Sequence, residues 1–465
     1  MKAIKLHSSA LFSLLLVALI SVFIVYFFNG TGQEADSYHH HLIAKYAFQY
    51  PTLFFDHWGK PFYTLLSAPL AQFGFYGSKY FNLLCSLTAL FFTYLIAKAL
   101  LFKSAHLVIW IGFLIPLNFQ VSFSAFTEPL FACLLLISIY LMSRSHARSS
   151  LLLISFLPMV RSEGLLIIGI FALYSLWNKK YRQLPLLLVG QTIFSLAAWL
   201  IYSKSPFWVI REIPYASTSS PYGQGDLFHF PEQLFYICGP VFLGLFLLGL
   251  IRTLFQGASQ DRFFSILIVG SFLIFFSFHA AAWKLGWFNS MGLKRVFGAV
   301  TPLMALIMLY GMNLLDEWSQ KLQKAKWIKL AVVATAAGLL FSRGPAGIDW
   351  SHEMNLSPSQ KLADRTGTFI LSKQVPFDRL IYADRFLHHS LHNDPYDPLK
   401  SKLLNSEVLA DLKQNDLIIW DNWHAPVDFG ITQQAVEQLP RTVKIKEFSA
   451  HSKGRQVRYV IYQVN

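Results

Sequence analysis

Residues 9–36 read SALFSLLLVALISVFIVYFFNGTGQEAD, an apolar run with two carboxylates directly beyond it. The run has the ~20 residues that one helical crossing of a bilayer needs. Glu34 and Asp36 follow where the chain leaves the membrane, and carboxylates beside hydrocarbon are costly enough to indicate a function. Two acids one residue apart can hold a metal ion, or one can act as a base while the other positions it. A solvated loop that contains two acids is the simpler alternative.

Composition places the whole chain among polytopic membrane proteins. Of its 465 residues, 54% are apolar and 14% are charged, and the mean hydropathy is +0.43. The first apolar run resembles a signal peptide, but it has no small-residue cleavage site, so we expect a retained anchor. All three cysteines fall within apolar runs, which is typical of core residues rather than disulfide partners. The candidate spans are 9–28, 78–101, 107–125, 128–143, 184–203, 234–255, 263–283, 297–315 and 328–342.

The distribution of charge predicts topology rather than binding to nucleic acid. The net charge is +14, and nearly all of the excess lies before residue 343. Cytoplasmic loops of membrane proteins carry an excess of Lys and Arg, so we place the basic loops and the N-terminus in the cytoplasm and the C-terminus outside. The residues that carry this signal are Lys103, Arg144, Arg148, Lys179, Lys180, Arg182, Arg252, Arg262, Lys321, Lys324, Lys326 and Lys329.

Residues 149–177 do not fit a single crossing. They lie between two basic loops, yet their middle holds Pro158, Arg161 and Glu163. If both flanks are cytoplasmic, this segment is a pair of short helices that turn inside the membrane, buried in protein or lining a wet cavity. The expected fold is therefore an α-helical polytopic membrane protein with about nine full spans plus a broken half-helix hairpin.

Two long exported loops and a polar tail complete the organisation. Residues 1–342 form the transmembrane domain, with exported loops at 29–77 and 204–233, and residues 343–465 form a small soluble exported domain. Aromatic stretches in the first loop predict helices along the interface. The Pro- and Gly-rich second loop is typical of a mobile flap over a site. Strand-like runs at 380–382, 417–420 and 459–462, and helical periodicity near 357–372 and 404–414, indicate an α/β fold for the tail.

Five motifs appear in an order that resembles the polytopic glycosyltransferases of the GT-C superfold. The similarity is to the branch of aminoarabinose transferases, protein O-mannosyltransferases and related polyprenyl-phosphate-sugar transferases, and it covers roughly residues 1–340. The first is the exported Glu-Ala-Asp at 34–36, with Tyr38 two residues on. The second is His57-Trp58-Gly59-Lys60-Pro61-Phe62, which departs from the H-x-x-K-P-P pattern at Phe62. The others are Thr127-Glu128-Pro129-Leu130, Arg161-Ser162-Glu163-Gly164 and Lys294-Arg295.

The resemblance implies a transferase that moves a sugar from a polyprenyl-phosphate-linked donor to an acceptor on the exported face of a bacterial inner membrane. It assigns the catalytic roles to Asp36, as the base, and to Glu34, as its helper. It assigns contacts with the substrates to Arg295, Lys294, Lys60, His57, Glu128 and Tyr38. A single inverting displacement is what the resemblance implies. The resemblance does not fix a cofactor, and a divalent metal held by Glu34 and Asp36 stays open. It also leaves open which sugar is transferred and whether the acceptor is a lipid, a glycan or a protein.

Each residue also has a structural alternative. Glu34 can complement a helix dipole, and Lys60 can reach the interface as a long cation without contacting a donor. Glu128 can cap its helix, and Arg161 with Glu163 is best explained as an ion pair that stabilises the hairpin. The run His39–His41 favours an interfacial polar face over a metal site. Two other functions stay open for the chain: a lipid-linked sugar flippase, and a non-catalytic assembly protein whose exported tail does the work.

Overall fold

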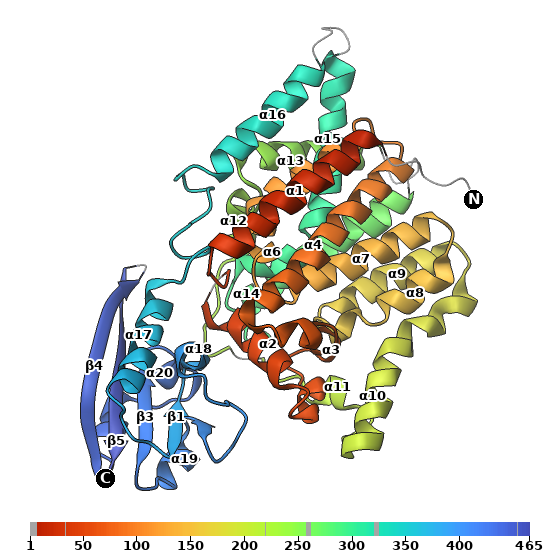
Figure 1. Ribbon diagram of the computed structural model, residues 1–465. Helices are drawn as coiled ribbons and strands as arrows, with labels where there is room; N and C mark the ends of the chain where they lie inside the picture. Colours follow the sequence, from red (N-terminus) through yellow and green to blue (C-terminus); the bar gives the residue numbers. More distant parts are fainter. Residues whose placement is uncertain (1–6, 33, 219, 257–261, 320–324, 453) are drawn as a thin grey trace.

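The computed structural model describes residues 7–32, 34–218, 220–256, 262–319, 325–452 and 454–465. A bundle of helices occupies residues up to about 340, and a five-stranded sheet with short helices packs against one end of it (Figure 1). The expected class, a helical membrane protein with a small C-terminal α/β part, is confirmed at this level. The boundary between residues 342 and 343 stays a prediction.

The helices of the bundle fall on the expected apolar runs. Among the described residues, four helical stretches are long and apolar enough to cross a membrane, and a bent pair gives a fifth. The number of nine full spans stays a prediction. The elements are α1 (Ser8–Phe27), α4 (Gly74–Ala99), α5 (Leu107–Leu114), α6 (Pro116–Ser122), α7 (Glu128–Ser143), α8 (Ala147–Ile154), α9 (Gly164–Trp177), η3 (Tyr181–Leu188), α10 (Val189–Tyr202), α12 (His229–Cys238), α13 (Pro240–Gln256), η4 (Phe264–Gly270), α14 (Ser271–Leu285), α15 (Thr301–Ser319) and α16 (Ala325–Leu340).

Two of the apolar runs are broken, and each break has a local cause. Pro116 begins α6, and the residue before a proline is pushed out of the helical region, as Ile115 is with ψ 119°. Gly239 has a φ of 73°, which a side chain would oppose, and the axes of α12 and α13 differ by 118° across it. The two breaks meet, because a Cβ atom on Gly239 would lie 3.6 Å from the Pro116 ring.

The segment 149–177 is a helical hairpin. Helix α8 continues into η2 (Leu157–Met159), the chain turns at Arg161–Glu163, and α9 returns. The tip reaches the first residue of α7, since Arg161 pairs with Glu128, while the far end of α9 lies beside Arg262 through Trp177. The 14 residues of α9 span about 21 Å, which is shorter than a bilayer core of ~30 Å. This geometry agrees with the expected pair of short helices, and their depth in the membrane stays a prediction.

Contacts place the basic loops and the sheet at opposite ends of the bundle. Lys329 donates a hydrogen bond of 2.9 Å to Ser104 at one end. At the other end, beyond α1, the Gly30 amide donates to the Met354 carbonyl at 2.7 Å, and Gln360 donates to Thr31 at 2.8 Å. Lys321, Lys324 and Lys326 lie outside the residues whose side chains are described. The arrangement is that expected from the charge pattern, and the compartment at each end stays a prediction.

Short helices lie between the bundle and the sheet. The first long loop folds into α2 (Glu34–Tyr46), η1 (Pro51–Phe55) and α3 (Pro61–Ala71), as the aromatic stretches predict. The second long loop is mostly irregular, with α11 (Trp208–Arg211) near its start. Figure 1 shows α2 and α3 along the edge of the bundle that faces the sheet. These segments therefore carry the polar motifs at the junction of the two parts.

The C-terminal sheet has the strand order β2-β1-β3-β5-β4. Strands β2, β1 and β3 run parallel, with Leu380 paired to Leu417, and β5 joins β3 antiparallel. Helix α17 opens with a capping box between Ser357 and Gln360, which satisfies amides of its first turn. The three expected strands and two expected helices are present. The bounds are α17 (Pro358–Ser372), β1 (Arg379–Tyr382), η7 (Arg385–Leu387), α18 (His388–Leu391), β2 (Ser401–Leu403), α19 (Ser406–Ala410), β3 (Asp416–Asp421), α20 (His424–Asp428), α21 (Gln433–Glu437), β4 (Thr442–Ser452) and β5 (Arg455–Val464).

Helix α2 shares the hydrophobic core of the sheet. Tyr38 and Leu42 of α2 are buried in one cluster with Leu380 and Leu417 of the strands. The Tyr38 ring lies 5.0 Å from that of Phe386 in η7, at an edge-to-face angle. The first turn of α2 is consequently fixed against the sheet and the bundle at the same time.

Candidate functional site

Asp36 and Arg295 form an ion pair at the junction. Asp36 lies in the first turn of α2, and Arg295 lies in η5 (Lys294–Ala299), which leads into α15. The guanidinium also sits over the ring of Phe126, 4.6 Å from its centroid. The Arg295 side chain is 17% exposed, whereas that of Asp36 is 41% exposed. The carboxylate is thus held by its partner on one side and open on another.

The charge of Asp36 is set by its neighbours. Burial alone would raise the pKa of this carboxyl, but the Arg295 guanidinium outweighs it and holds the pKa below its ordinary 3.8. His40, one helical turn further along α2, has its pKa lowered to about 3 by burial. Its ring interacts electrostatically with Asp36, Arg295 and Lys60, which places all four groups in one site. At neutral pH the site contains a carboxylate, two cations and a neutral imidazole.

Lys60 is positioned by the turn that precedes α3. Its backbone adopts a φ of 65°, and the next residue, Pro61, begins the helix with a suitably fixed φ. The side chain is buried, and its ammonium group donates to the hydroxyl of Tyr215 and to that of Ser162 at 3.4 Å. The ammonium also lies 4.5 Å from the centroid of the Tyr215 ring. The second long loop therefore closes over Lys60 through Tyr215.

His57 contacts the same loop. Its Nε2 atom donates to the carbonyl of Val209 at 2.7 Å, and burial lowers the pKa of its imidazole. The neighbouring turn is fixed by the Gly59 amide, which donates to Asp56 at 2.6 Å. These bonds give His57 a structural role in tying α11 to the first loop. A direct contact between His57 and a substrate stays a prediction.

The hairpin tip carries a buried network of charges. Arg161 pairs with Glu128 and with Glu163, both at 2.7 Å, and donates to Thr127 at 3.2 Å. His279 lies 3.5 Å from Glu163. The expected pair of Arg161 and Glu163 is present, and it extends to Glu128. Glu128 thus joins α7 to the hairpin, and a substrate contact for it stays a prediction.

Two of the expected substrate residues lie at the margin of the site. Tyr38 is 6% exposed and packs against Phe386 and His389 of the C-terminal part. The Lys294 ammonium lies 5.8 Å from the centroid of the Tyr236 ring. The structure gives Tyr38 a position in the packing between α2 and the sheet. A contact of either residue with a substrate stays a prediction.

A divalent metal held by Glu34 and Asp36 stays a prediction. Glu34 begins α2, but its side chain lies outside the described residues. Within the described part of the chain, no group of three or more His, Cys, Asp or Glu side chains is arranged to hold a metal ion. His39 and His40 have ring contacts with Trp58, and His41 bonds Ser78 at 2.8 Å. The rings of all three histidines are therefore packed or hydrogen-bonded, and the Nδ1 atom of His40 is buried without a hydrogen-bond partner.

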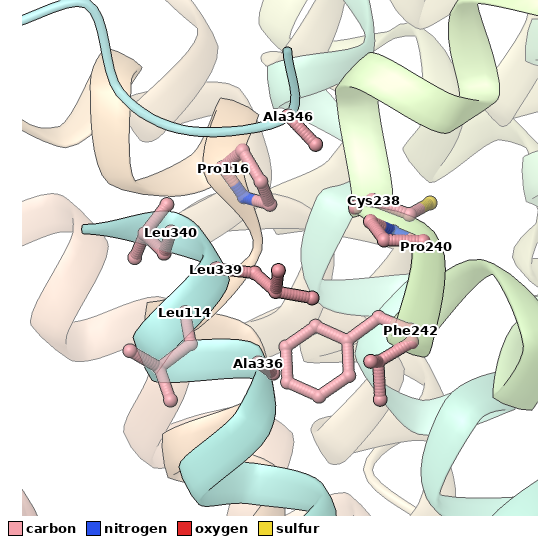
Figure 2. A pocket seen from close by; sticks show the side chains of 11 residues that line it. Leu114, Pro116, Cys238, Pro240, Phe242, Ala336, Leu339, Leu340 and Ala346 are labelled. Atoms are coloured by element: carbon pink, nitrogen blue, oxygen red, sulfur yellow. The ribbon is translucent and has the colours of Figure 1, made fainter. Parts of the chain in front are cut away.

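A separate apolar pocket lies at the two helix breaks. Figure 2 shows its wall, which α5, α6, α12, α13 and α16 supply. None of its lining residues has a charged side chain, so the chemistry described above lies elsewhere. The lining includes Leu114, Pro116, Cys238, Phe242, Leu340 and Ala346.

The structure adds residues that the motifs did not indicate. Tyr215 and Ser162 bond each other at 2.9 Å and both contact Lys60. From the C-terminal part, the charge of His424 acts on Asp36, and Tyr222 of the second loop also interacts with Asp36. Pro and Gly marked that loop as a cover, but no sequence pattern shows which of its side chains points inward.

Comparison with known proteins identifies the fold. No protein-family model matches the sequence, and no curated protein matches it. Two crystal structures of ArnT from Cupriavidus metallidurans are similar over nearly their whole length. The one bound to undecaprenyl phosphate has 13% identity and a TM-score of 0.57, covering 97% of each chain. The apo structure has 11% identity and a TM-score of 0.62, covering 97% of this chain and 98% of that chain. At this identity the likeness shows an ArnT-like fold.

Proposed function

We propose that this chain is an integral-membrane glycosyltransferase that moves a sugar from a polyprenyl-phosphate-linked donor to an acceptor hydroxyl. The observation that carries the proposal is the ion pair of Asp36 and Arg295, set beside Lys60 at the junction of bundle and sheet. The fold supports it, because one of the similar ArnT structures is bound to undecaprenyl phosphate. A lipid phosphate needs cations at the end of an apolar bundle, and this site supplies them.

Asp36 is the base in this mechanism. It accepts the proton of the acceptor hydroxyl while the acceptor oxygen bonds to the anomeric carbon and the bond from that carbon to the lipid phosphate breaks. The pair with Arg295 keeps Asp36 ionised but also weakens it as a base. When a donor phosphate takes over the guanidinium, the carboxylate loses this partner and becomes more basic. Binding of the donor and activation of the base are then one event.

The cations act on the leaving group. Negative charge grows on the phosphate as the glycosidic bond breaks, and donors already in place stabilise it without reorganisation. Arg295 can contact two phosphate oxygens at once, and Lys60 offers a point charge fixed by Tyr215 and Ser162. Lys294, adjacent in the chain, extends the positive surface. Glu34 assists Asp36, either by orienting it or by sharing a divalent metal.

The finer parts of the proposal concern location and substrates. We infer that the site opens on the exported face of a bacterial inner membrane and that the transferred sugar is a hexose or a pentose. The lack of net charge beyond residue 343, against the basic loops at the other end of the bundle, supports this orientation.

The test is sugar transfer by the purified full-length protein in nanodiscs. The donor is an undecaprenyl-phosphate-linked sugar carrying a radiolabel in the sugar, and the readouts are labelled product and released undecaprenyl phosphate. Binding of undecaprenyl phosphate alone is measured in parallel. We expect micromolar binding of the lipid and turnover that depends on Asp36. Movement of the labelled donor between leaflets without cleavage would overturn the proposal in favour of a flippase.

A further inference from the structure

The C-terminal sheet contains a topological switch point. The chain goes from β1 outward to β2 and then returns to the other side of β1 to form β3, and all three strands run parallel. Open parallel sheets bind ligands in the crevice outside the carboxyl ends of the strands at such a point. Asp384 follows β1 and Asp421 ends β3, so both carboxylates lie at this crevice.

The crevice faces the site at Asp36. Asp384 begins η7 by accepting from the Phe386 amide at 2.8 Å, and the Phe386 ring packs on Tyr38, two residues from Asp36. From the other side, Tyr222 of the second long loop donates to Asp428 of α20 at 3.0 Å. The same loop contacts Lys60 through Tyr215. The carboxyl ends of β1 and β3 are thus linked by contacts to α2 on one side and to the second long loop on the other.

Polar groups in the crevice have hydrogen-bonding capacity that is not used. Asp421 is 2% exposed, and its Oδ1 atom binds the Nδ1 atom of His424 at 3.1 Å. Its Oδ2 atom is buried with no hydrogen-bond partner. The His424 side chain is 24% exposed. A buried acceptor without a partner indicates a ligand group or a water. Trp423, beside them, is 39% exposed.

We propose that this crevice is the acceptor subsite and that it binds a neutral saccharide. A sugar hydroxyl both donates and accepts hydrogen bonds, so it can donate to Asp421 and accept from His424. An exposed indole such as Trp423 offers the apolar face that a sugar ring needs. Because this inference assigns an acceptor, it rests on the proposed function.

The balance of charge decides against an anionic acceptor. Asp384, Asp421 and Asp428 all act on His424, which is the cation among them. Arg455 adds one positive charge, stacked 5.4 Å from the centroid of the Trp423 ring. Together with Asp36, Arg295 and Lys60 of the neighbouring site, the four carboxylates and four cations balance. The crevice therefore has no positive surplus with which to bind a phosphate or carboxylate, whereas a neutral saccharide needs none.

Saturation-transfer NMR on the full-length protein in nanodiscs tests the proposal. The probes are the methyl glycosides of glucose, galactose and mannose, with glucose 6-phosphate and glucuronate as charged counterparts. We expect at least one methyl glycoside to bind, more tightly than both charged sugars. Asp421→Asn and Trp423→Ala should each weaken that binding at least tenfold. Trp423 is partly exposed, so its variant keeps the test valid if Asp421→Asn fails to fold.

The chain offers a matched control. Asp349 and His352 form a pair at 2.8 Å with the same spacing of three residues, outside the crevice. Asp349→Asn should leave glycoside binding unchanged. Tighter binding of the charged sugars, or equal binding in Trp423→Ala, would overturn the proposal. Affinity for undecaprenyl phosphate should stay within twofold in all three variants. If the protein bound glycosides but not undecaprenyl phosphate, the saccharide site in the crevice would be supported and the proposed function would be rejected.

Discussion

Arg295 pairs with Asp36 across 259 residues of the chain and joins η5, which precedes α15, to the first turn of α2. Both residues lie at the end of the bundle that carries the sheet, so the ion pair connects two sides of the site. In the absence of a donor, each residue neutralises the charge of the other. The pair therefore predicts opposite effects of its two members on donor binding.

Asp36→Asn should collapse turnover and keep donor binding. The amide retains the shape of the side chain but cannot act as a base, and loss of a general base typically costs ~10²–10⁴-fold in rate. Without the carboxylate, Arg295 is freed, so affinity for undecaprenyl phosphate should be equal or higher. Single-turnover transfer and lipid binding in nanodiscs measure both. Wild-type turnover in Asp36→Asn would remove this residue from the chemistry.

Arg295→Ala should weaken both binding of undecaprenyl phosphate and turnover. Arg295→Lys should restore only part of each, because an ammonium group cannot contact two phosphate oxygens in the fixed geometry of a guanidinium. The measurements are the lipid dissociation constant and kcat/KM for the donor. Arg148→Ala, an exposed position on α8, serves as the charge-removal control. If Arg295→Ala bound the lipid like the control, the phosphate contact would have to be reassigned to Lys60.

The sequence allowed the elements to be predicted but not their meeting points. Hydropathy located the helices, because burial in lipid demands long apolar runs whatever the tertiary arrangement. The pair of Arg161 and Glu163 is expected from the sequence, as the structural alternative to a substrate role. Its extension to Glu128 is not, since 33 residues separate Glu128 from Arg161 and only the packing of α8 on α7 brings them together.

The packing of the C-terminal sheet against the bundle is the largest feature that the sequence does not predict. The resemblance implies a substrate contact for Tyr38, and the structure adds that Tyr38 packs on Phe386 in the core of the C-terminal part. An aromatic residue at the start of an interfacial helix gives no sign of which surface will cover it. For the same reason the sequence does not predict that His424 lies near Asp36.

Arg161→Ala should destabilise the bundle strongly. The substitution leaves Glu128 and Glu163 buried without their cation, and breaking a buried pair in this way costs ~3–5 kcal/mol. Thermal unfolding in detergent, compared with Arg148→Ala on the same hairpin, measures the effect. We expect a clear fall in the midpoint for Arg161→Ala and none for the control. Equal midpoints would show that the network contributes little to folding.

Reporter fusions should resolve the orientation of the bundle. A reporter after Asn465 or within 210–230 is expected on the exported side, whereas one within 145–149 or 178–183 is expected in the cytoplasm. The hairpin explains why the last two loops share a side, since α8 rises to Arg161 and α9 returns. Opposite sides for those two loops would contradict the hairpin, and an exported report from both would reverse the whole orientation.

The stability of the C-terminal part should fall at alkaline pH through His424. Burial alone would lower the pKa of this imidazole, but the carboxylates of Asp421 and Asp384 outweigh it and raise the pKa to about 10, against 6.5 in an unfolded chain. A pKa raised by folding stabilises the folded state fully below the unfolded value, and the stabilisation is lost as pH rises through the folded value. The contribution should therefore be complete below pH 6.5 and disappear between pH 6.5 and 10.

Thermal midpoints of wild type and His424→Gln, taken from pH 6 to pH 10, should converge as pH increases. His451→Gln, an exposed histidine on β4, should track wild type throughout, and a constant gap between wild type and His424→Gln would show that its effect is not a matter of charge.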